Sequence, residues 1–229
     1  MISFLEEVEQ SLPAGLVLPD EFRSLFDWME ANGFVHQYKR SGERYASLYP
    51  AKLEDVPERP IVGITAPHRG GSLVTFHAAY DAHFVEAWTG NKDPEVAGRL
   101  AIFINTGGDG SQAGLWKNDE GRQVFVHVGS GSGSTMVSTL ADNPVDMLRL
   151  LAIGYQELCW PEEFTTPPTA DEDGNYLPPT QFRKWVETSF GVTIPITASE
   201  IVSYPAEMGD ETSDDAFCRW ITKHSPNMT

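Results

Sequence analysis

Cysteine is scarce in this sequence, and long apolar runs are absent. Its only two cysteines, Cys159 and Cys218, lie far apart in a chain of 229 residues. This excludes a small disulfide-stapled fold and favours a reducing compartment. No apolar run reaches membrane-spanning length, and residues 1–9 contain three glutamates in place of the basic region and apolar core of a signal peptide. We therefore expect a cytoplasmic protein that makes no contact with membranes.

Basic residues are also few. The chain has 16 Lys and Arg residues against 33 Asp and Glu residues, which gives a formal net charge of −17. Nucleic-acid binding depends on clustered basic side chains, so direct binding of nucleic acid is excluded. Two interpretations of the acidic composition stay open: a surface that only keeps the protein in solution, or a surface that attracts a basic partner.

Motifs of the common enzyme classes are missing as well. The chain has no G-x-S-x-G, H-E-x-x-H or G-x-G-x-x-G motif, and no Lys-Ser/Thr pair follows the Gly/Ser segment at residues 129–134, which is therefore predicted to be a mobile hairpin loop. Residues 171–175 resemble the start of a calcium loop, but Tyr176 stands where that loop requires glycine. We expect no catalytic residues, no bound metal and no cofactor.

Apolar segments dominate the middle of the chain. Residues 100–104 form an apolar run that breaks at the turn Gly108-Asp109-Gly110 and resumes up to Trp116. Further segments that favour strands lie at 61–64, 73–76, 83–88 and 124–128, separated by turn residues. Their short spacing favours antiparallel pairing. Together with the helices expected on either side, they predict the α+β class, an antiparallel sheet with helices packed against it.

Helix signals flank this region. Residues 2–12 predict a short helix, and Pro19 opens a clearer one that ends at Asn32 and Gly33. Asn143 is expected to cap a further helix. Beyond it, residues 181–190 predict a helix, Thr197-x-x-Glu200 has the spacing of a capping box, and Asp214 or Asp215 is expected to begin the last helix.

The order of these elements resembles a known superfamily. The resemblance rests on residues 100–116 with their Gly-Asp-Gly turn, the segment 123–128, the helix opening at 143–151, and the run Leu18-Pro19-x-x-Phe22-x-x-Leu25 closed by Asn32-Gly33. In this order they are similar to the SUKH superfamily, which holds many bacterial toxin-immunity proteins and fungal cell-wall-synthesis regulators. The resemblance covers the first two thirds of the chain. It implies an intracellular binding protein.

The chain is expected to divide near residue 155. Residues 1–155 are predicted to form the SUKH-like α+β domain, and residues 156–229 an acidic, partly helical extension docked on it. Apolar faces on two predicted helices of the extension need a surface to cover, so their aromatic residues should be buried. These residues are Phe182, Trp185, Phe190, Phe217 and Trp220.

Acidic residues of the extension are the candidate binding residues, because they concentrate negative charge beyond the family-like region. Trp116 joins them as an aromatic residue expected to be exposed beside Asp109, where it would form a contact hot spot. The full set is Asp109, Trp116, Glu162, Glu163, Asp171, Glu172, Asp173, Glu207, Asp210, Glu211, Asp214 and Asp215.

Three functions follow in order of preference. The first is an immunity protein that neutralises a cognate, basic toxin domain, for example a nuclease, by stoichiometric binding. The second is an intracellular regulatory or scaffold module, as in the fungal branch of the superfamily. The third is an enzyme without a recognisable motif that uses His77 or His83, expected on neighbouring strands, together with a remote carboxylate.

Overall fold

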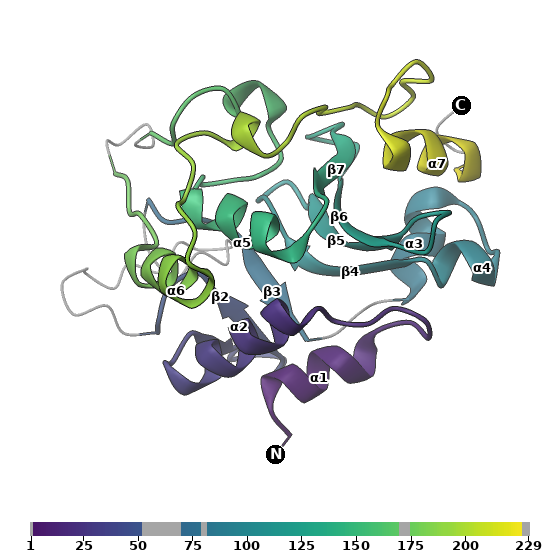
Figure 1. Ribbon diagram of the computed structural model, residues 1–229. Helices are drawn as coiled ribbons and strands as arrows, with labels where there is room; N and C mark the ends of the chain where they lie inside the picture. The colour runs from purple at the N-terminus through teal and green to yellow at the C-terminus, as the bar shows by residue number, and fades with distance from the viewer. Residues whose placement is uncertain (1, 52–69, 79–81, 170–174, 226–229) are drawn as a thin grey trace.

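Seven antiparallel strands form one sheet, and they lie in the sheet in the same order as in the chain (Figure 1). The computed structural model describes residues 2–51, 70–78, 82–169 and 175–225. The strands are β1 (Val35–Gln37), β2 (Arg44–Ser47), β3 (Thr75–His77), β4 (Leu100–Asn105), β5 (Gln112–Lys117), β6 (Gln123–Val128) and β7 (Val137–Ala141). The predicted antiparallel pairing is confirmed.

Helices pack against both faces of this sheet. They are α1 (Phe4–Ser11), α2 (Asp20–Ala31), α3 (Ala82–Thr89), α4 (Pro94–Ala97), α5 (Pro144–Ile153), α6 (Thr180–Phe190) and α7 (Ala216–His224), with the short 3-10 helices η1 (Pro161–Glu163) and η2 (Ala198–Glu200). No helix in the described part of the chain is long and apolar enough to span a membrane. The α+β class and the helical C-terminal extension are confirmed.

The two faces of the sheet carry separate apolar cores, because side chains alternate between the faces along each strand. Leu115 and Phe125 point into the larger core, which α1, α2, α5 and α6 cover. The neighbouring Trp116 and Val126 point to the other face, where α3, α4 and α7 cover a smaller core. Burying each of these large side chains contributes about 2 kcal/mol to folding.

A glycine allows β4 and β5 to approach at a bulge. The register of β4 shifts between Ile102 and Ile104, opposite Gly114 of β5. A Cβ atom on Gly114 would lie 1.8 Å from the carbonyl oxygen of Ala101. Only glycine therefore fits this position, and the bulge that it permits places Phe103 and Ile104 together in the larger core.

The C-terminal extension closes the outer edge of β7. Met136 forms a bridge with Glu207, and the backbone N–H of Val137 donates to the carbonyl of Ala206 at 2.7 Å. Two residues on, the backbone N–H of Thr139 donates to the carboxylate of Asp215 at 2.9 Å. An open strand edge can pair with another chain, and these contacts occupy donors on that edge.

Aromatic residues of the extension pack as the sequence predicts. Phe182 and Phe217 are fully buried, and Trp220 is 7% exposed. Trp185 stacks on Trp28 of α2 with ring centroids 5.1 Å apart, so α6 contacts the N-terminal region. The extension thus adds to both cores. The division of the chain at residue 155 stays a prediction.

One predicted strand is wrong. Residues 83–88 belong to the helix α3, and the proposed pairing of His77 and His83 on neighbouring strands does not exist. A short apolar run fits a buried strand and a helix face equally, and here the face containing Val85 and Trp88 packs on the smaller core. The predicted strand at 61–64 lies outside the described residues.

The predicted capping residues at the starts of three helices are confirmed. Asn143 caps α5 by accepting a hydrogen bond from the backbone N–H of Asp146. Asp215, one of the two candidates, caps α7, and the capping box of Thr197 and Glu200 opens η2. These signals depend on residues within one turn of each other, so the sequence is sufficient to locate them.

Candidate protein-binding surface

The extension includes α6, which lies beside α2, and continues past β7 to α7 (Figure 1). It carries a disproportionate share of the charge. Residues 156–229 contain 13 Asp and Glu residues and four Lys and Arg residues, a net charge of −9 within the total of −17. We define the acidic surface as Glu162, Glu163, Glu200, Glu207, Asp210, Glu211 and Asp214. Within the described ranges, none of these carboxylates forms an ion pair.

Tyr155 joins the two short helices that hold the first half of this surface. Its hydroxyl donates to the carbonyl of Thr166 at 2.6 Å and accepts from the backbone N–H of Ala198 at 3.1 Å. The backbone N–H of Ser199 donates to the carbonyl of Phe164 at 2.8 Å. Through these bonds η1, which carries Glu162 and Glu163, is fixed beside η2.

Glu163 lies close to two other carboxylates. Partial burial raises the pKa of this carboxyl, and the nearby charges of Glu162 and Glu157 raise it further. No described cation offsets them. A positive group placed here by a partner would therefore relieve repulsion that the isolated protein retains.

The second half of the acidic surface lies just before α7. The backbone N–H of Met208 donates to the carbonyl of Thr135 at 2.8 Å, which ties the turn to the end of β7. The Asp210 carboxylate accepts from the backbone N–H and the hydroxyl of Thr212 at 2.9 and 2.7 Å. Glu207, Glu211 and Asp214 project into solvent from this ordered turn.

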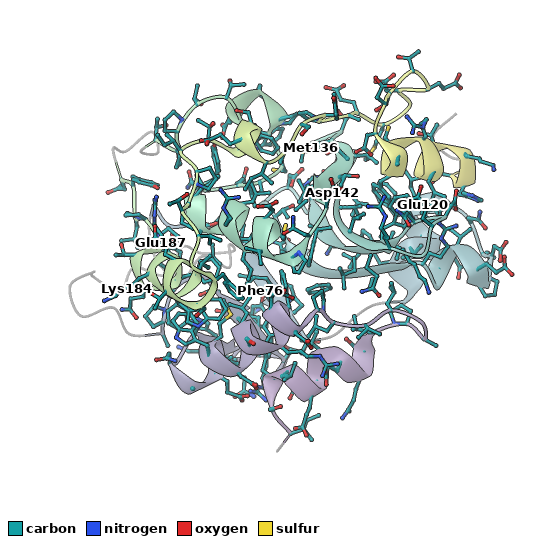
Figure 2. The ribbon with its side chains drawn as sticks, viewed as in Figure 1. Phe76, Glu120, Met136, Asp142, Lys184 and Glu187 are labelled. Carbon is teal, nitrogen blue, oxygen red and sulfur yellow. The ribbon has the colours of Figure 1, made fainter. Side chains whose placement is uncertain are left out.

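A shallow hollow of about 210 Å³ lies along this surface, between the end of β7 and the extension. Its lining includes Asp142, Tyr204 and Asp214; Asp142 is labelled in Figure 2. Tyr204 is 65% exposed, and Ile196, which precedes η2, is 68% exposed. An exposed tyrosine bordered by carboxylates combines apolar contact area with charge, the composition that protein interfaces favour.

Asp109 is a structural residue and does not offer its carboxylate to a partner. It accepts hydrogen bonds from the backbone N–H groups of Ser111 and Ser134 and from the hydroxyls of Ser111 and Ser130, at 2.8 to 2.9 Å. Partial burial opposes ionisation, but these bonds outweigh it and lower the pKa to about 2. The Gly/Ser segment at 129–134 connects β6 to β7, so the predicted hairpin is confirmed, whereas the hydrogen bonds from Ser130 and Ser134 to Asp109 argue against its predicted mobility.

The expectation that Trp116 is exposed beside Asp109 is wrong. Trp116 is 3% exposed and lies in the smaller core, with ring centroids 5.3 Å from Phe217 and 5.4 Å from Trp220. It stands at the opposite end of β5 from the turn that holds Asp109. The sequence could not reveal this, because the cover is provided by α7, about 100 residues further along the chain.

Asp215 is likewise excluded from the binding set. It is 6% exposed, and its carboxylate is shared between the backbone N–H groups of Cys218 and Thr139. The candidates Asp171, Glu172 and Asp173 lie outside the described residues. Of the predicted set, Glu162, Glu163, Glu207, Asp210, Glu211 and Asp214 lie on the acidic surface.

His127 and His77 sit in structural positions. His127 is fully buried, with Nε2 2.9 Å from the Thr106 hydroxyl and Nδ1 3.0 Å from the carbonyl oxygen of Met136. Burial lowers its pKa to about 4, although the Met136 bond acts in the opposite direction. His77 Nε2 lies 3.1 Å from the Thr75 hydroxyl, and burial lowers its pKa also. Among the described residues, no group of three or more His, Cys, Asp or Glu could hold a metal ion.

The sequence interpretation overlooked four residues at this surface: Asp142, Ile196, Glu200 and Tyr204. Glu200 was recognised only as part of a capping box. Tyr204 and Ile196 each sit beside a proline, outside any helix or strand, and this was the available signal that no element would bury them.

Comparison of the chain with protein-family models, curated proteins and solved structures finds no match. The functional argument therefore rests on the geometry and charge of the surface.

Proposed function

We propose that this chain is a non-enzymatic, cytoplasmic binding protein of the SUKH immunity type, which neutralises a cognate basic toxin domain by stoichiometric binding. The observation that carries the proposal is the acidic surface, whose carboxylates form no ion pairs among the described residues and of which Asp214 shares a hollow with the exposed Tyr204.

The two parts of the surface have separate tasks in this proposal. Exposed carboxylates accelerate the encounter with a cationic partner and lose influence as salt is added. Tyr204, with Ile196, supplies the apolar contact that retains the partner once bound, because buried aromatic side chains dominate the energy of many interfaces. A nuclease cleft, which must be cationic to bind phosphate, is a partner of the required charge.

Order in the surface also supports a binding role. The Tyr155 bonds at η1 and η2, the Met208 bond to Thr135 and the Asp210 turn fix the backbone segments that carry the carboxylates. A preformed surface binds with a smaller loss of conformational entropy than a flexible acidic tail. The acidic charge is thus presented in a defined geometry.

The test is co-purification with the product of the adjacent upstream gene, followed by a growth-rescue assay in cells that express that product. We expect a one-to-one complex and rescue. A triple variant, Glu162→Lys, Glu163→Lys and Asp214→Lys, should slow association about tenfold or more at low salt.

A charge-matched control separates the surface from the overall charge. Asp27→Lys, Glu43→Lys and Glu95→Lys change the net charge by the same amount at exposed positions outside the acidic surface. This variant should associate far faster than the first. Equal rates for the two variants would show that the acidic surface is not the contact. A regulatory scaffold would instead bind a partner without rescuing growth.

A further inference from the structure

A second cavity, outside the acidic surface, lies between α7 and the turn that joins β5 to β6. Its volume is about 420 Å³, within the range of small-molecule sites. It is lined by Trp116, Asn118, Asp119, Glu120, Arg122, Ala216, Arg219, Trp220, Lys223 and His224. Figure 2 shows Glu120 at this junction, close to α7.

Basic side chains gather around this cavity in a chain that has few of them. Arg122, Arg219 and Lys223 line it, and the guanidinium of Arg99 lies 5.0 Å from the ring centroid of Trp220. The cavity also contains two carboxylates, but each is engaged. Asp119 pairs with Arg99 at 2.8 Å, and Glu120 pairs with Arg122 at 2.7 Å.

Arg219 and Lys223 are left without a carboxylate partner among the described residues. Arg219 donates one hydrogen bond, to the carbonyl of Ser213 at 2.8 Å, and retains further donors. Lys223 and His224 also offset the partial negative charge at the C-terminal end of α7. Arg219, in the middle of the helix, has no such role.

Buried hydrogen-bond donors without partners concentrate at the same place. The indole N–H groups of Trp116 and Trp220 are both buried and unpaired, and both side chains line the cavity. Thr222 lines an adjoining hollow together with Glu211, Arg219 and Lys223. Native structures leave few buried donors unpaired, so two indole N–H groups in one place point to an acceptor supplied from outside.

We propose that this cavity binds a small oxyanion, the carboxylate or phosphate group of a small molecule. Arg219 and Lys223 provide the positive charge, and Trp220, whose indole N–H has no hydrogen-bond partner, lies beside them in the lining. Trp220 is the more exposed of the two indoles, at 7% against 3%. The site depends on none of the carboxylates assigned to toxin binding, so it is independent of the proposed function.

The experiment is isothermal titration of the full chain with inorganic phosphate, glucose 6-phosphate and succinate, each matched in ionic strength with sodium chloride. We expect one site with a Kd of about 1 mM or lower for at least one of these probes. Comparing phosphate with succinate shows whether the cavity prefers a phosphate group or a carboxylate group. Binding of all three no stronger than chloride would overturn the proposal.

Three variants locate the site. Arg219→Gln with Lys223→Gln should weaken binding about tenfold or more, because two charge-assisted bonds are lost. Arg183→Gln with Lys184→Gln removes the same charge from α6 and should leave affinity unchanged. Trp220→Phe should weaken binding several-fold, and its free energy of unfolding should fall moderately because the smaller ring leaves space in the core. Equal affinity in the wild type and the Arg219/Lys223 variant would contradict the site.

Discussion

The carboxylate of Asp215 accepts the backbone N–H of Thr139 at 2.9 Å, across 76 positions of the chain. The same carboxylate caps α7 by accepting the backbone N–H of Cys218 at 2.7 Å. One side chain therefore starts the last helix and fixes it to the edge strand of the sheet. The turn that carries Asp210, Glu211 and Asp214 is held in place by this connection.

Replacing Asp215 with Ala should lower the free energy of unfolding by about 2 kcal/mol or more. The variant loses a helix cap and leaves the N–H of Thr139 without its partner. Urea denaturation measures the effect. Asp214→Ala, at the exposed neighbouring position, should change stability by less than about 0.5 kcal/mol. Similar losses in the two variants would contradict the role given to Asp215.

His127 should make the protein less stable in mild acid. Its pKa is about 4 in the folded protein and 6.5 when unperturbed, so between these values the unfolded chain binds a proton that the folded chain does not. The free energy of unfolding should therefore fall as the pH decreases from about 6.5 to about 4, by on the order of 3 kcal/mol.

His127→Gln is the variant that isolates this effect. Glutamine can bond to Thr106 and Met136 but does not titrate, so the variant should lack this part of the pH dependence. Denaturant melts at several pH values give the slopes. Parallel slopes for wild type and variant would mean that another group is responsible.

Asp109 should contribute stability that is also lost toward acid, but at a lower pH than for His127. Its folded pKa, about 2, is below the unperturbed value of 3.8, so its contribution is complete above about pH 3.8 and is lost as the pH falls through about 2. Asp109→Asn should lose about 2 kcal/mol at neutral pH, because the amide cannot accept the four bonds equally. Asp142→Asn, a control at an exposed position, should leave the free energy of unfolding unchanged. If Asp109→Asn left the free energy of unfolding unchanged, Asp109 would not be a structural residue.

If the proposed function holds, Tyr204→Ala should weaken binding of the proposed toxin partner by about 30-fold, equivalent to about 2 kcal/mol, mainly through faster dissociation. The free energy of unfolding should barely change, since the side chain is 65% exposed. Surface plasmon resonance resolves the two rates. Val17→Ala, at a position that is 58% exposed on the N-terminal part of the chain, is the control. Dissociation as slow as in wild type would place Tyr204 outside the interface.

The sequence predicted the elements whose signals are local. Asn143, Pro144 and Asp146 specify the start of α5 within one turn, and the apolar spacing of Phe22, Leu25 and Met29 specifies the buried face of α2. The Gly-Asp-Gly turn between two apolar runs was sufficient for β4 and β5. The prediction from sequence failed at residues 83–88, because the spacing of apolar residues alone does not separate a short strand from a helix.

Of the binding surface, the sequence provided the charge and little of the geometry. It placed excess carboxylates after residue 155, because charge is a property of composition. It did not identify Tyr204 as exposed.

The roles of individual site residues were decided by tertiary structure alone. The sequence predicted three surface residues that the fold engages in other contacts. Trp116 is covered by α7, Asp109 bonds to the 129–134 loop, and Asp215 bonds to the backbone of Thr139. Local signals act within one turn of the chain, so the residues themselves determine where helices and strands begin. Exposure and hydrogen bonding depend on which distant segments pack together, and that is settled only when the complete chain folds.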